Sequence, residues 1–223
     1  MEKEIYIIRG IERENRDAFS NRIFEATNSA LANASPGKLS LTITDKAPPK
    51  MSVIPFGKSL VAAISVTQPK VSPVPDLFSP DGFAGAYRVW EELPVSYEKN
   101  WPDRSPSPGA CLLTLFRRKK GIDYNTFIDR WHNGHTPLSL KVHPLWHYSR
   151  NVVREKLVES PEWWDGIVEE HTRTRPELFN PMKFFGGPFA MPYNMIRVYA
   201  DVKSFLDYKN VEPYLVTEYR LKN

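Results

Sequence analysis

Residues 110–135 read ACLLTLFRRKKGIDYNTFIDRWHNGH and predict a strand followed by a helix. The strand, Ala110–Arg118, is a short apolar run that ends in basic residues, as is typical of a buried strand. Asp123 suits the N-cap position of a helix over 124–135, in which Phe127 and Trp131 share one face. The chain therefore begins a strand-helix unit at its midpoint.

The start of the chain repeats this pattern. A shift of 108 residues places Ile5 on Leu113, Ile7 on Leu115, Arg9 on Arg117, Phe19 on Phe127 and Arg22 on Arg130. A shift of 127 places Phe78 on Phe205, Tyr87 on Tyr214, Val89 on Val216 and Glu91 on Glu218. The second half then carries an insertion in the irregular region 172–201. Chance matches between amphipathic segments are the alternative explanation.

Further strands are expected at residues 4–9, 38–45, 59–67, 86–94, 145–153, 165–172 and 214–221, with a helix at 15–33. Prolines are expected to break up any single helix between 173 and 212, leaving a short one near 202–208. Each half then has the βαββαβ order of a ferredoxin-like unit. We predict an α+β fold in which two ferredoxin-like repeats form a dimeric α+β barrel-type architecture. The Pro-rich and Ser-rich stretch 101–109 separates an N-terminal repeat, 1–100, from a C-terminal repeat, 110–223.

Composition narrows the class of protein. Hydrophobic residues make up 41% and charged residues 25% of the 223 positions, which is ordinary for a globular chain. The net charge is +4, but 30 basic residues are interleaved with 26 acidic ones, so no nucleic-acid surface is expected. The single cysteine, Cys111, excludes an intrachain disulfide and suits a reducing compartment. No apolar stretch has the length of a membrane span, so we expect a cytoplasmic protein without a membrane partner.

The histidines gather in one stretch. Four of the five lie within sixteen residues, at His132, His135, His143 and His147. An imidazole held in a pocket can take up and return a proton near neutral pH. Gly134 and Pro137 suggest that the helix stops at His135, which would present its ring to a cavity or, alternatively, cap the last carbonyl groups.

A metal site is not expected among these histidines. Their spacing resembles that of metal ligands, but no HExxH pattern occurs and no carboxylate or cysteine lies between them.

Strand alternation places Tyr148 and Arg150 on one face of the strand 145–153 and Asn151 on the other. Trp131 could stack on a flat substrate or belong to the core. No phosphate loop, nucleophile elbow or dinucleotide motif is present, so no cofactor is expected.

The stretch 112–153 resembles the EthD family of dimeric α+β barrel proteins. The matching positions are Phe127, Trp131, His135, Pro137, Tyr148 and Asn151, together with the ending FLD and YLVTE. The resemblance implies a hydrophobic barrel cavity with His135 near its mouth as the general acid or base. We further predict a catalytic role for Tyr148 and substrate-binding roles for Trp131, Arg117, His147 and Asn151. The first half has Thr27 where the histidine would stand.

Three functions are consistent with the sequence. The first is an enzyme, such as a lyase or cyclase, that acts on an aromatic or polyketide-like small molecule by acid-base chemistry, in cyclisation, dehydration or decarboxylation. The second is an oxidoreductase, either a cofactor-free monooxygenase or a haem enzyme. The third is a non-catalytic small-molecule binding protein. A small-molecule substrate and a second copy of the chain, in a homodimer, are the expected partners.

Overall fold

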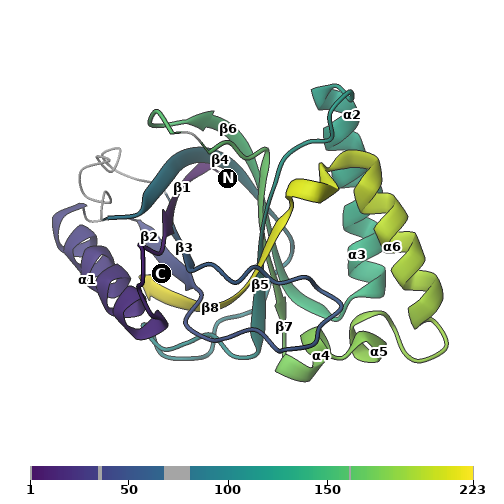
Figure 1. Cartoon of the computed structure of the whole chain (residues 1–223), viewed down its shortest axis with the longest axis horizontal. Helices are drawn as coiled ribbons and strands as arrows, with labels where there is room; N and C mark the ends of the chain where they lie inside the picture. Colours follow the sequence, from purple (N-terminus) through teal and green to yellow (C-terminus); the bar gives the residue numbers. More distant parts are fainter. Residues whose placement is uncertain (1, 35–36, 68–80, 161, 223) are drawn as a thin grey trace.

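Eight antiparallel strands close into a barrel in the computed structural model, which describes residues 2–34, 37–67, 81–160 and 162–222 (Figure 1). The strands are β1 (Glu2–Arg9), β2 (Lys38–Ile43), β3 (Val61–Thr67), β4 (Phe83–Val95), β5 (Ala110–Phe116), β6 (Leu145–Lys156), β7 (Gly166–Thr172) and β8 (Glu212–Lys222). Each overlaps a strand predicted above, and the prediction of an α+β barrel is confirmed. The aligned Phe78 lies outside the described residues.

The strand order is the same in both halves of the chain. Around the barrel it runs β1-β3-β2-β8-β5-β7-β6-β4. Within each half, the strands lie side by side in the order fourth, first, third, second, counted along the chain. This is the strand order of a ferredoxin-like sheet. The pairs β2-β8 and β4-β6 join the halves and leave no open sheet edge. A single chain thus closes the barrel by itself.

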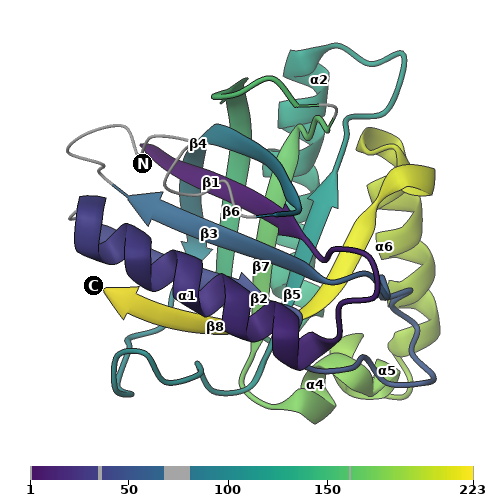
Figure 2. The ribbon, with the colours of Figure 1, turned by 60° about the vertical axis from the view of Figure 1, so that its left-hand side comes forward.

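Helices cover the barrel on two opposite sides (Figure 1). The long helix α1 (Arg16–Ala34) lies across β1, β3, β2 and β8 (Figure 2) and buries Phe19 and Ile23 against that outer face. The second half carries α2 (Tyr124–Asp129), the π-helical turn η2 (Arg130–His135), α3 (Thr136–Val142), α4 (Arg175–Phe179), α5 (Pro181–Phe184), α6 (Met191–Phe205) and the 3₁₀ turn η3 (Tyr208–Asn210). None of the described helices is both long and apolar enough to cross a lipid bilayer.

Two predicted helix boundaries are wrong, both because of proline. The helical run does not stop at Gly134 but passes through η2 into α3, where Pro137 occupies the first turn. Similarly, α6 begins at Met191, far before residue 202, with Pro192 in its first turn. Proline is tolerated there because the first N–H groups of a helix have no partner within the helix.

Side chains fill the interior of the barrel. An apolar cluster that includes Ile5, Ile7, Leu113, Leu115 and Val216 occupies the space between the strands. The prediction placed a hydrophobic cavity inside the barrel, but the described side chains fill this part of the interior. An eight-stranded barrel can be filled in this way or can hold one small ligand, and the pocket that His135 lines lies elsewhere.

Candidate functional site

The pocket with apolar walls lies outside the barrel, between the sheet of the second half and its helices. It encloses about 240 Å³. Its sheet side comes from β5 and β7, its helix side from α3, α6 and the π-helical turn η2. Residues Val53–Pro55, from the loop between β2 and β3, form part of the wall. Both halves of the chain therefore contribute to one pocket, which is somewhat smaller than the roughly 300–1,000 Å³ usual for small-molecule sites.

His135 lines this pocket and is held at both ring nitrogens. Its Nδ1 lies 2.6 Å from Oδ2 of Asp201 on α6, and its Nε2 lies 3.0 Å from Oγ of Ser139 one helical turn further along. The ring also packs against Phe205, with centroids 5.2 Å apart. A histidine that caps backbone carbonyls is therefore ruled out. Its carboxylate partner fixes the ring orientation and stabilises the imidazolium form.

Glu170 faces the same pocket from the outer surface of β7. No hydrogen bond or ion pair to its carboxyl group occurs among the described residues, and it is half-buried beside apolar side chains. Burial raises its pKa above the ordinary value, while the charge of His135 partly opposes this. A carboxyl group of this kind holds a proton to higher pH than usual and is suited to donate it.

Tyr148 and Trp131 form part of the wall of the pocket. Tyr148 is fully buried, and burial together with the charge of Glu170 raises the pKa of its phenol. Its hydroxyl stays protonated and can donate a hydrogen bond. The Trp131 ring packs edge-on against Phe116 at a centroid distance of 4.9 Å, so it is both core and pocket wall.

The other three predicted binding residues do not line this pocket. His147 and Asn151 point into the barrel, where the Asn151 amide donates to the carbonyl of Ile167 at 2.9 Å. Arg117 lies exposed at the end of β5 and donates to the carbonyl of Trp163 at 2.9 Å. Alternation along β6 separates Tyr148 from its neighbours, because adjacent residues point to opposite faces of a sheet.

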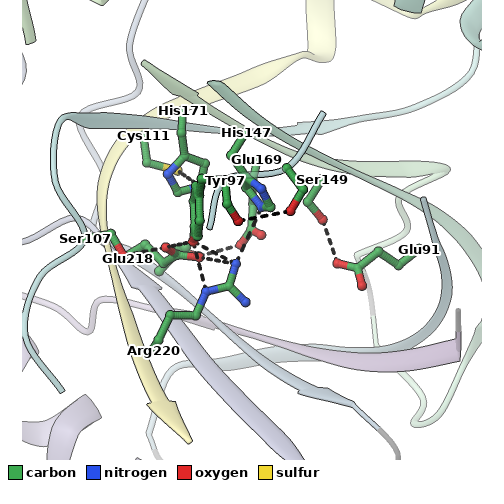
Figure 3. A network of polar contacts seen from close by, with 12 residues as sticks. Glu91, Tyr97, Ser107, Cys111, His147, Ser149, Glu169, His171, Glu218 and Arg220 are labelled. Atoms are coloured by element: carbon green, nitrogen blue, oxygen red, sulfur yellow. Dashed lines mark hydrogen bonds and ion pairs between the residues drawn. The ribbon is translucent and has the colours of Figure 1, made fainter. Parts of the chain in front are cut away.

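His147 belongs to a polar network at one end of the barrel (Figure 3). Tyr97 stacks on its ring at 4.2 Å and donates to Glu218 at 2.5 Å, and Glu218 pairs with Arg220 at 2.8 Å. Burial lowers the pKa of His147 to about 3, helped by His171 and Arg220. No group of three or more metal-type ligands occurs in the described ranges. The network closes one end of the barrel with paired charges.

Three polar residues of the site, the two partners of His135 and Glu170, were missed in the sequence. Ser139 stands four positions after His135, a spacing that places both on one helix face and could have pointed to it. Glu170 alternates with the inward Glu169 in β7, but the facing direction was not predictable. Asp201 lies 66 positions from His135, and nothing local links the two.

Comparison with known proteins supports the fold. An anthrone oxidase-like protein of known structure matches 98% of this chain and 90% of its own, with a TM-score of 0.56 and 10% identity. A candidate monooxygenase from Fusobacterium nucleatum subsp. nucleatum ATCC 25586 matches 99% of this chain and 92% of its own, with a TM-score of 0.51 and 10% identity. At this identity the likeness concerns the fold alone. No family profile and no curated protein sequence matches the chain.

Proposed function

We propose that this chain is an enzyme that transfers protons on a flat, apolar, aromatic or polyketide-like molecule bound outside the barrel. The observation that carries the proposal is the Asp201–His135 pair at the wall of a pocket with an otherwise largely apolar lining. No lysine or arginine is among the described lining residues, which favours an uncharged substrate with carbonyl or phenol groups.

The proton path follows from the hydrogen bonds. His135 takes a proton from an acidic C–H or O–H group of the substrate, directly or through the Ser139 hydroxyl. Asp201 stabilises the imidazolium that results. Glu170, on the opposite wall, donates its proton to a carbonyl or leaving oxygen. An acid and a base on facing walls serve cyclisation, dehydration or decarboxylation equally well.

Oxidation is the second candidate, favoured by the names of the two structural neighbours. With an anthrone, the same deprotonation would give an electron-rich anion that dioxygen can oxidise. The methylene carbon becomes a carbonyl group, one oxygen atom enters the product and the other leaves as water. A haem iron bound at His135 does not fit, because both ring nitrogens already contact protein side chains.

We also propose that the two halves are repeats of one ferredoxin-like unit and that the second is EthD-like. Their common strand order and the matched pairs in β1 and β5 support the repeat. In the first half, Thr27 donates to the carbonyl of Ile23 at 2.6 Å, and α1 packs tightly on the sheet. The first half thus serves mainly as a scaffold and adds residues 53–55 to the pocket wall, and the second half provides His135 and its partners.

The test uses anthrone as the probe, with fluorescence quenching for binding and oxygen uptake and product analysis for turnover. His135→Asn should bind anthrone as the wild type does but lose turnover by about 10²-fold or more. His132→Asn is the matched control, because His132 lies on the same helical run but does not line the pocket.

Turnover without oxygen uptake would support proton transfer alone, and turnover with uptake would support the oxidative candidate. Binding of anthrone without conversion would favour a binding protein over an enzyme. Full activity in His135→Asn, or equal losses in both variants, would contradict the role given to His135.

A further inference from the structure

The outer side of α5 and α6 carries an apolar surface that no described residue covers. Phe189 is 98% exposed, Ile196 71% and Tyr193 67%, and Met182 and Tyr199 are exposed beside them. Tyr193 and Ile196 are three residues apart and share one face of α6. We call these five residues the α6 face. Such a concentration of exposed large apolar side chains indicates a binding surface.

The charge around the α6 face is positive. Lys183, Arg197, Lys203 and Lys209 are all exposed. Two acidic residues lie in the same part of the chain: Asp201 contacts His135, and Asp207 accepts a hydrogen bond from the neutral Asn210 amide at 2.8 Å and keeps its charge. Arg197 follows Ile196 directly, and the Lys203 ammonium lies 5.0 Å above the Tyr199 ring. Basic groups therefore border the apolar side chains.

From this arrangement we infer, against the sequence-based expectation of no membrane partner, that the α6 face docks onto an anionic lipid surface. Aromatic and aliphatic side chains enter the headgroup region, while flanking lysine and arginine groups contact the lipid phosphates and carboxylates. A second copy of the chain fits less well, because pairing the same face would bring together more basic than acidic side chains from each copy.

Docking would hold the pocket beside the lipid. Val198, Val202 and Phe205, on the other side of α6, line the pocket. The helix α6 thus lies between the α6 face and the pocket. Docking of the α6 face does not depend on which reaction occurs in the pocket, or on whether one occurs.

The test is co-sedimentation of the full chain with vesicles of phosphatidylcholine alone or mixed with phosphatidylserine. We expect binding to the mixed vesicles about tenfold tighter than to phosphatidylcholine, and weaker at high salt. Ile196→Asp should remove most of this binding without unfolding the chain, because the side chain is exposed. Leu93→Asp, on β4 and 44% exposed, is the control and should bind as the wild type does.

Arg197→Glu separates the electrostatic part and should reduce binding to the mixed vesicles only. Equal binding by the wild type and Ile196→Asp, or no preference for phosphatidylserine, would overturn the inference. So would a dimer in sedimentation velocity that dissociates in Ile196→Asp, since the α6 face would then be covered by a second copy.

Discussion

At the scale of single residues, the site depends on what holds each ionisable group. His135 has a carboxylate on one nitrogen and a hydroxyl on the other. Glu170 has no described partner and sits in apolar surroundings, so its pKa is raised. These surroundings suit His135 to the role of the base and Glu170 to that of the acid in the proposed reaction.

Asp201→Asn should reduce turnover of anthrone by about 10²-fold while leaving its binding unchanged. The amide cannot stabilise the imidazolium, and its N–H can impose the other tautomer of His135. Nitrogen NMR of the His135 ring reports this tautomer directly. An unchanged ring spectrum would show that Asp201 does not position His135.

Glu170→Gln should change how stability depends on pH. The pKa of the folded state is raised, so the contribution of Glu170 is fully present below the ordinary value of 4.5 and is lost as pH rises through the raised pKa. The variant, which cannot ionise, should melt at the same temperature as the wild type near pH 4 and above it near pH 8. The opposite order at pH 8 would mean that the carboxylate is stabilised in the fold.

At the scale of elements, the π-helical turn determines where His135 points. The backbone N–H of Thr136 bonds to the carbonyl of Trp131, five residues back. This wider turn lets Trp131 pack inward while His135 reaches Asp201 on α6. Such turns commonly occur at functional sites.

Two glycines near the pocket should respond oppositely to alanine. A Cβ atom at Gly134 would have its nearest contact at 3.9 Å, from Asp201, so Gly134→Ala should stabilise the fold by about 0.5–1 kcal/mol. At Gly166 it would lie 2.3 Å from Phe116 and 2.8 Å from Trp131, so Gly166→Ala should destabilise by about 1–3 kcal/mol. Urea unfolding measures the change in unfolding free energy for each variant. Changes of the same sign would contradict the packing described at one of the two glycines.

At the scale of the whole molecule, the inner and outer faces of the barrel differ in what they contain. The interior packs an apolar cluster and closes one end with the network around Tyr97, Glu218 and Arg220. The outer face of the first half is covered by α1, and that of the second half retains a pocket. The pocket therefore lies on the outer side of second-half strands whose inner side packs the barrel interior.

Global stability should fall in mild acid because His147 is buried in its neutral form. Its pKa of about 3 in the fold lies below the ordinary 6.5, so its contribution is full above pH 6.5 and declines as pH falls toward 3. The slope for this one group is up to about 1.4 kcal/mol per pH unit. His147→Gln should remove this one group's share of the change in unfolding free energy with pH, measured by urea unfolding between pH 4 and 6. An unchanged slope would assign the acid sensitivity to other groups.

The sequence alone determined the strands, the α+β barrel class and three residues that line the pocket, His135, Tyr148 and Trp131. The strands follow from local patterns, because alternation and apolar runs are readable within a few residues, and the three pocket residues were singled out by the histidine cluster and the resemblance to the EthD family. The course of the helix after Gly134 could not be read from local patterns, since a proline that ends one helix can also begin the next.

Only the tertiary structure decided which side of the sheet holds the pocket and which groups complete it. Alternation shows that Tyr148 and Asn151 face opposite ways but not which way is inward. Asp201 contacts His135, and Glu170 lines the same pocket, because the chain folds α6 and β7 around it, 66 and 35 positions away in sequence. Contacts between distant segments depend on how the whole barrel closes, and no local pattern of residues encodes that.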